Sequence, residues 1–167
     1  MSIQDVDVRR AAPRLAAVSN MRRAPVRKIR VLIVDDIAEN RAVLGVCCEH
    51  FGVSYEAVDS GRGAVEAVRS GRFDLVFMDI LMPGMDGVAA TRAIRALPGP
   101  AALVPIIAVT TAAEPMDLLH YRACGITDVV PKPIDVSRLM NALNSAVAEA
   151  RRLRRSKLRH ERVQLTA

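Results

Sequence analysis

Acidic, hydroxyl and ammonium side chains follow four of the short apolar runs in this 167-residue chain. They are Asp35, Asp36, Asp79, Thr110 and Lys132. Three carboxylates in one pocket repel one another, so gathering them is costly unless a cation neutralises their charge. Hard oxygen ligands that leave room for water suit Mg²⁺. If the fold brings these residues together, the sequence predicts a divalent-cation site.

Strand-like and helix-like segments alternate from residue 30 to residue 155. Aliphatic runs predict strands at 31–34, 55–58, 75–78, 106–109 and 126–130. Amphipathic spacing predicts helices at 38–50, 61–70, 86–97, 114–124 and 135–155. Five such units favour an α/β fold, a doubly wound five-stranded parallel sheet with five helices, the last extended. Ligands in such sheets bind outside the carboxyl ends of the strands, which is where the reactive residues fall.

Glycines mark the ends of three predicted helices. Gly52, Gly71 and Gly125 each fall just past a helical pattern, where a left-handed backbone conformation commonly ends the helix. Because glycine adopts that conformation without steric cost, we expect it at these three positions.

The composition excludes several classes of protein. Apolar residues make up 51% and charged residues 25%, as in soluble globular domains, and the 3% aromatic content predicts an aliphatic core. No apolar run is long enough to span a bilayer and no signal peptide is evident, so we expect a cytoplasmic location. Cys47, Cys48 and Cys124 lack metal-ligand spacing and leave an odd thiol in any disulfide scheme, so we expect reduced, buried cysteines.

Charge is segregated along the chain, although the net value is only +6. Residues 1–30 hold eight Lys/Arg against two Asp, residues 151–162 hold seven Lys/Arg against one Glu, and the segment between them is acidic. We therefore predict a basic flexible extension at 1–28, a domain at 29–150 and an Arg-rich extension at 151–167 that continues the last helix.

Four motifs resemble one known family over about residues 28–150. They are Val31-Leu32-Ile33-Val34-Asp35-Asp36, Phe77-Met78-Asp79-Ile80-Leu81-Met82-Pro83-Gly84-Met85-Asp86-Gly87, the run Ile106 to Thr110, and Pro131-Lys132-Pro133. In this order and spacing they resemble the receiver (CheY-like) domain of bacterial response regulators, particularly receivers of hybrid kinases and phosphorelays. The resemblance implies the flavodoxin-like strand order 2-1-3-4-5.

The resemblance also implies a phosphorylation site. Asp79 matches the carboxylate that takes a phosphoryl group from a phosphohistidine, so the domain is expected to be a phospho-acceptor, not an enzyme acting on other substrates. Lys132 matches the lysine that pairs with a phosphoryl oxygen, and in the family the bond before the residue matching Pro133 is cis. Thr110 matches a switch hydroxyl that moves toward the phosphoryl group.

A magnesium site is implied beside the phospho-acceptor. Asp36 matches a direct ligand of Mg²⁺ and Asp35 a ligand acting mainly through water. Asp79 and the backbone carbonyl of Leu81 complete the expected ligand set. The switched surface in the family comprises the last two helices and the strand between them, here near 114–124, 126–130 and 135–150.

Three positions depart from the family pattern. The residue three before Lys132 is usually aromatic, but here it is Val129. The positions two after Asp79 and two after Thr110, which tune dephosphorylation, hold Leu81 and Ala112. Neither side chain can orient an attacking water, so we expect slow autodephosphorylation.

The expected partner in phosphotransfer is a histidine kinase or a histidine phosphotransfer protein that docks on the first helix, near 39–50. Because no second domain follows, we expect a stand-alone receiver that acts on an unknown protein target. The Arg-rich extension has three interpretations: a solvated helix end, an attraction to nucleic acid or an anionic membrane, or cyclic di-GMP binding as in some related receivers. Its candidate side chains are Arg151, Arg152, Arg154, Arg155 and Arg159.

Two other kinds of protein with similar sheets fit these site residues less well. Phosphatases with an aspartyl-phosphate intermediate usually place a second acid where Leu81 stands. A flavodoxin needs a phosphate-cradling loop after the first strand, and Asp35-Asp36 would repel a phosphate unless a metal intervened. Both alternatives are therefore disfavoured.

Overall fold

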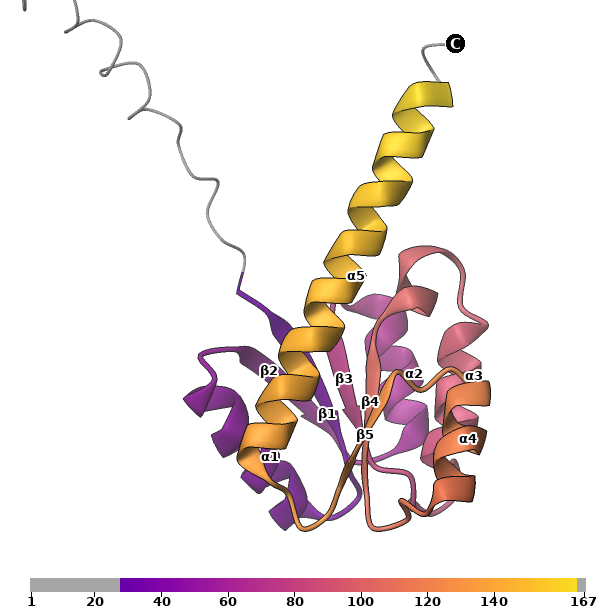
Figure 1. Cartoon of the computed structure of the whole chain (residues 1–167). Helices are drawn as coiled ribbons and strands as arrows, with labels where there is room; N and C mark the ends of the chain where they lie inside the picture. Colours follow the sequence, from indigo (N-terminus) through magenta and orange to yellow (C-terminus); the bar gives the residue numbers. More distant parts are fainter. Residues whose placement is uncertain (1–27, 165–167) are drawn as a thin grey trace, which may run out of the picture.

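The computed structural model describes residues 28–164, with side chains through Leu153. The described chain forms a five-stranded parallel sheet in the order β2-β1-β3-β4-β5, which confirms the predicted doubly wound α/β fold (Figure 1). The strands are β1 (Arg30–Val34), β2 (Ser54–Val58), β3 (Leu75–Met78), β4 (Ile106–Thr110) and β5 (Asp128–Pro131).

The central strands are apolar because helices cover both of their faces. Residues of β3 and β4 are buried throughout, whereas β2, at one edge, is mostly exposed. The prediction for β5 began two residues too early, at Ile126. Ile126 is buried, but it follows the left-handed Gly125 and belongs to the turn after α4. An apolar residue can be buried in a turn, so its apolarity alone did not locate the start of the strand.

Two helical layers enclose the sheet. The helices are α1 (Ala38–His50), α2 (Gly61–Ser70), α3 (Gly87–Arg95), α4 (Pro115–Ala123) and α5 (Val136–Gln164), and a 3₁₀ helix, η2 (Gly99–Leu103), precedes β4. Helices α1 and α5 pack on one face through residues such as Leu44 and Leu139. Helices α2, α3 and α4 pack on the other through residues such as Val65, Ile94 and Tyr121. This arrangement leaves the carboxyl edge of the sheet to the loops.

The glycine prediction is correct at two of its three positions. Gly52 and Gly125 have φ values of 67° and 96°, as a left-handed helix end requires. Gly71 has φ −100°, so that prediction is wrong. A Cβ atom at position 71 would lie 2.5 Å from the ring of Phe73 and 2.7 Å from the Ala67 carbonyl oxygen. Glycine is needed there for close packing and not for a left-handed turn.

Helix α5 extends well past the body of the domain. It runs from the carboxyl edge of the sheet across its face and continues beyond the opposite edge (Figure 1). Its 29 residues span about 44 Å at the usual rise of an α-helix. The basic extension expected at residues 1–28 lies outside the described residues, apart from Lys28. Within the described part, no helix is both long and apolar enough to cross a membrane.

The three cysteines are free and buried, as the sequence predicts. Cys47 and Cys48 lie on the inner side of α1, and Cys124 ends α4. Burial raises the pKa of the Cys48 thiol to about 12, with the charges of Cys47 and Glu49 adding to the effect. This thiol is therefore protonated at neutral pH and acts as a packing residue.

Candidate functional site

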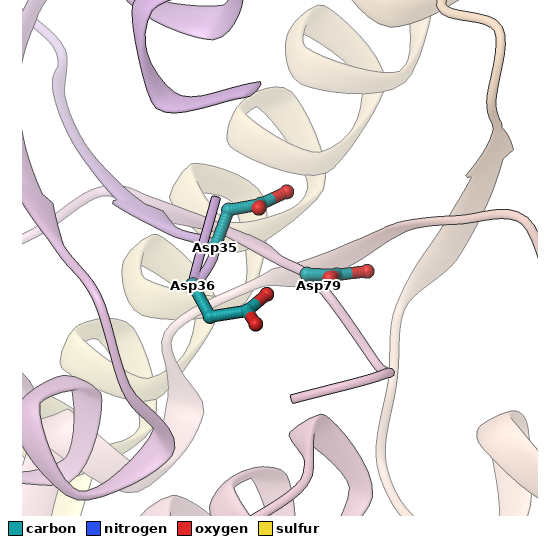
Figure 2. A group of neighbouring side chains, drawn as sticks. All are labelled: Asp35, Asp36 and Asp79. Atoms are coloured by element: carbon teal, nitrogen blue, oxygen red, sulfur yellow. The ribbon is translucent and has the colours of Figure 1, made fainter. Parts of the chain in front are cut away.

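Three carboxylates meet at the carboxyl edge of the sheet. Asp35 and Asp36 directly follow β1, and Asp79 directly follows the neighbouring strand β3. One oxygen from each lies within 4.8 Å of the others, and Figure 2 shows the three side chains projecting toward the same side. The parallel sheet thus brings together residues that are 43 or more positions apart in sequence.

Lys132 adds a cation to this group from the loop between β5 and α5. Its Nζ lies 2.8 Å from Oδ2 of Asp35 and 3.3 Å from Oδ1 of Asp79. The Lys132 side chain is 16% exposed and the two carboxylates are buried more deeply. The peptide bond to Pro133 is cis. One ammonium group therefore offsets part of the negative charge of the site.

Both oxygens of the Asp35 carboxylate accept hydrogen bonds. Oδ1 accepts the backbone N–H of Ile37 and the side-chain amide of Asn40, both at 3.0 Å, while Oδ2 accepts Lys132. The residue is fully buried, so these bonds replace the water that it loses. Its position is fixed by the loop, the first turn of α1 and the Lys132 loop together.

Asp36 differs from Asp35 because part of its carboxylate has no partner. Oδ1 of Asp36 is buried and accepts no hydrogen bond within the described protein. A buried ionised oxygen without a partner is unfavourable. Together with the two neighbouring carboxylates, it fits the hard oxygen donor set that a divalent cation such as Mg²⁺ prefers.

Asp79 is almost fully buried and accepts a backbone hydrogen bond. The residue is 5% exposed, and its Oδ1 accepts the N–H of Ile80 at 2.9 Å. Burial raises the pKa of its carboxyl above the ordinary value and the charge of Asp35 adds to the rise, whereas Lys132 and the Ile80 N–H oppose it. Additional positive charge beside Asp79 would therefore stabilise its ionised form.

Glycine at position 87 lets α3 approach the loop after β3. A Cβ atom there would lie 2.2 Å from the Asp79 carbonyl oxygen, and the Gly87 N–H donates to the Ile80 carbonyl oxygen at 3.0 Å. Asp86 caps the same helix by accepting the Ala89 N–H at 2.7 Å. The Asp86-Gly87 pair in the sequence motif therefore positions the backbone beside Asp79.

Thr110 and Leu81 complete the set of residues that the sequence singled out. Thr110 is fully buried at the end of β4, and its Oγ1 accepts the N–H of Ala112 at 3.2 Å. Leu81 lies on the loop two residues after Asp79, with its side chain 60% exposed. The apolar side chain of Leu81 thus faces solvent two residues after the buried Asp79.

The sequence analysis missed two residues, Asn40 and Arg41, on the first turn of α1. Nη1 of Arg41 donates to the carbonyl oxygens of Asp35 at 2.8 Å and of Asp36 at 3.0 Å, while Asn40 binds the Asp35 carboxylate. Their spacing places them one turn into the helix, within reach of the preceding loop. This spacing in the sequence is compatible with a supporting role. It does not distinguish such side chains from ones that point into solvent.

The Arg-rich extension is not part of this site. Arg151 and Arg152 are exposed on α5, and Arg152 pairs with Glu149 at 2.9 Å. They lie 15 and 16 residues after the start of α5 at Val136, about 23 Å along the helix. The side chains of Arg154, Arg155 and Arg159 lie outside the described residues.

Sequence comparison relates the chain to parts of much longer proteins. It is 38% identical over 144 residues to the virulence sensor protein BvgS of Bordetella pertussis, a match to 84% of this chain and 12% of the relative. It is 40% identical over 115 residues to the sensor protein GacS of Pseudomonas syringae, covering 68% and 13%. The chain thus matches about one eighth of the length of these relatives.

Solved structures share the fold. The receiver domain of a sensor histidine kinase from Pseudomonas aeruginosa PAO1, with a magnesium ion in its active-site cleft, is 30% identical with a TM-score of 0.67 and covers 72% of this chain and 98% of its own. A chemotaxis protein of Vibrio cholerae is 28% identical with a TM-score of 0.66, covering 71% and 98%. The family model described as "Response regulator receiver domain" matches residues 31–144. With the acidic cluster at the carboxyl edge, this match shows that the chain belongs to the response regulator receiver family of two-component signal transduction.

Proposed function

We propose that Asp79 of this receiver domain accepts a phosphoryl group from a phosphohistidine and that the modification switches a protein-binding surface. The observation that carries the proposal is the buried carboxylate of Asp79 with Nζ of Lys132 at 3.3 Å. A nucleophilic carboxylate beside a fixed cation suits phosphoryl transfer, in which catalysis consists mainly of positioning and charge stabilisation.

The transfer forms one bond and breaks one. A carboxylate oxygen of Asp79 attacks phosphorus, and the bond from phosphorus to the donor imidazole nitrogen breaks. The electron pair of that bond stays on the imidazole nitrogen, and Asp79 becomes an aspartyl phosphate. Lys132, which already lies beside Asp79, pairs with a phosphoryl oxygen and exchanges part of its contact with Asp35 for it.

The cation expected here is Mg²⁺, and the residues present fit it. Asp35, Asp36, Asp79 and the Leu81 carbonyl would hold it, with Asp36 the most direct ligand because its buried Oδ1 has no partner among the described residues. When bound, Mg²⁺ spreads the negative charge that develops on the transferring group. Arg41 and Asn40 keep the Asp35-Asp36 loop in place for this task.

The donor is a histidine kinase or a histidine phosphotransfer protein, and α1 is the proposed docking helix. Val43 and Val46 on its outer side are 50% and 65% exposed, and Ile37 just before the helix is 49% exposed. Ile37 directly follows Asp36, and Val43 and Val46 lie on the helix that begins one residue later, so a partner that covers them brings its phosphohistidine near the site. Exposed apolar groups near a reactive centre are suited to protein contact.

Intact-mass spectrometry of the purified chain tests the proposal. With Mg²⁺ and a small phosphoramidate donor, we expect one phosphoryl adduct on the wild type and none on Asp79→Asn. Asp59→Asn is the matched control, because Asp59 is an exposed acid that follows β2 at the same edge. An adduct that persists in Asp79→Asn, or a wild type that takes no phosphoryl group from this donor or from a histidine kinase, would refute the proposal.

For the Arg-rich extension, the described contacts favour the solvated helix end. Arg152 is 77% exposed and its partner Glu149 lies one turn earlier on the same helix. The position of Arg152 near the middle of α5, which ends at Gln164, leaves this side chain to solvent and to that local ion pair. Titration of the chain with cyclic di-GMP tests the alternative, which requires binding that is lost on truncation after Ala150.

A further inference from the structure

Two hydrogen bonds meet at Ala112, in the loop between β4 and α4. The Ala112 N–H donates to Oγ1 of Thr110 at 3.2 Å. The Ala112 carbonyl oxygen accepts the hydroxyl of Tyr121 at 3.1 Å. A single residue thus joins the side chain at the end of β4 to a side chain on α4.

Tyr121 is placed to hold that loop firmly. It is 4% exposed and packs in the same core cluster as Val129 on β5, so its ring has little freedom. On the outer side of α4, Met116 and Leu119 are 76% and 65% exposed. The buried ring and the exposed pair therefore belong to one short helix, and a displacement of the ring displaces the exposed side chains.

The Tyr121 hydroxyl remains a donor across the physiological pH range. Burial raises the pKa of Tyr121, and the carboxylates of Asp117, Asp79 and Asp86 raise it further. The phenol is therefore neutral when the domain is active, and its proton stays available for the Ala112 carbonyl oxygen.

We propose that Tyr121 is a positioning residue for Thr110 and that it couples the phosphorylation state of Asp79 to the position of α4. The inference rests on the proposed phosphorylation of Asp79. A Thr110 hydroxyl that turns to a phosphoryl group on Asp79 releases the Ala112 N–H, so the Ala112 peptide is free to move. Because the Tyr121 hydroxyl is bound to that peptide, α4 either follows the loop or loses the bond.

This route replaces the aromatic residue that is absent from β5. The Val129 side chain is small and has no polar group that could bind the loop after β4. The Tyr121 hydroxyl, in contrast, donates directly to that loop. Both residues belong to the same core cluster, on the face of the sheet that α4 covers. Coupling in this chain therefore runs from Thr110 through Ala112 to Tyr121.

NMR spectra of ¹⁵N-labelled protein with and without beryllofluoride and Mg²⁺ test the inference. Beryllofluoride mimics the phosphoryl group on Asp79. In the wild type we expect amide signals of residues 79–81, 110–113 and α4 to shift. In Tyr121→Phe the first two groups still shift, while the displacements in α4 fall to less than half. Affinity for beryllofluoride rises about fivefold, because one hydrogen bond no longer holds the loop in place.

Tyr55→Phe is the matched control, since the chain has two tyrosines. The Tyr55 hydroxyl lies 3.4 Å from Oε1 of Glu49 at an exposed position, away from the β4–α4 loop. We expect its spectra to change with beryllofluoride as the wild type does. The Tyr121→Phe variant retains the buried ring, and a single cooperative melting transition shows that it is folded.

A second readout uses the wild-type chain alone. With ¹³C-labelled tyrosine, beryllofluoride should shift the ring signal of Tyr121 and leave that of Tyr55 in place. A Tyr121 signal that stays in place, or α4 amides that shift equally in Tyr121→Phe, overturns this inference and leaves the proposed function intact. Absence of any response at residues 79–81 in the wild type overturns both.

Discussion

Nζ of Lys132 lies 2.8 Å from Oδ2 of Asp35, although 97 residues separate the two in sequence. The contact exists because β1 and β5 run in the same direction in one sheet and end at the same edge. It places a cation inside an acidic cluster before any metal binds. The same ammonium reaches Asp79 at 3.3 Å, so Lys132 is shared between the proposed metal site and the proposed phospho-acceptor.

Removal of this cation should destabilise the metal-free domain. In Lys132→Met two buried carboxylates lose their shared partner, and breaking a buried ion pair costs about 3 kcal/mol. We expect urea unfolding in EDTA to show a loss of that order, partly recovered by millimolar Mg²⁺, and at least tenfold slower phosphorylation. Lys28→Met removes the same charge at an exposed position and should do neither. Equal stability of the two variants would contradict the shared role.

The raised pKa of Asp79 predicts a pH dependence of stability. Its folded pKa lies above the ordinary value of 3.8, mainly through burial, so the folded domain binds a proton more tightly than the unfolded chain. The free energy of unfolding of the metal-free protein should therefore fall as the pH rises from 3.8 through the folded pKa. A folded pKa that exceeds the unfolded pKa by one corresponds to a loss of about 1.4 kcal/mol.

Asp79→Asn isolates this effect because the amide does not ionise. In EDTA the variant should be more stable than the wild type at pH 7, and the gain should shrink as the pH falls toward 4. Urea unfolding at several pH values measures the difference. A gain that is the same at pH 7 and pH 4 would mean that packing, and not ionisation, explains it.

Arg41 should affect metal binding without touching the metal. Its guanidinium fixes the carbonyl oxygens of Asp35 and Asp36, and loss of such a supporting contact typically weakens metal affinity about tenfold. We expect Arg41→Met to raise the Kd for Mg²⁺ by that factor in calorimetric titration. Arg72→Met, an exposed change ahead of β3 at the other edge of the sheet, is the control. A Kd within twofold of the wild type would show that the loop is held by other contacts.

Much of the fold follows from local patterns in the sequence. The apolar runs located the central strands because helices cover those strands on both faces, and the helices α1 and α2 begin and end where their spacing predicts. The start of β5 was misplaced because the buried Ile126 precedes the strand. Gly71 was misjudged because its need for glycine comes from the ring of Phe73, a contact that spacing does not reveal.

The residues of the site were predicted more completely than their contacts. Asp35, Asp36 and Asp79 meet as expected, since the ends of parallel strands meet at one edge. The supporting Arg41 and the link from Tyr121 to Ala112 were not predicted, because both depend on which way a long side chain turns after the helix is packed. The sheet topology alone predicts which side chains meet at the strand ends. The contacts of Arg41 and Tyr121 can be predicted only from the packed three-dimensional structure.

Leu81 should make the phosphorylated state long-lived. Its exposed side chain beside Asp79 offers no hydrogen bond to an attacking water, and Ala112 offers none from the β4–α4 loop. An amide at position 81 supplies both a donor and an acceptor, so Leu81→Asn should lose its phosphoryl group about tenfold faster. Leu103→Asn introduces the same amide at a leucine of similar exposure, 58% against 60%, on η2. Intact-mass time courses after removal of the donor should show decay over hours for the wild type and Leu103→Asn. If Leu81→Asn decays at the same rate as these two, access of water and not its orientation limits hydrolysis.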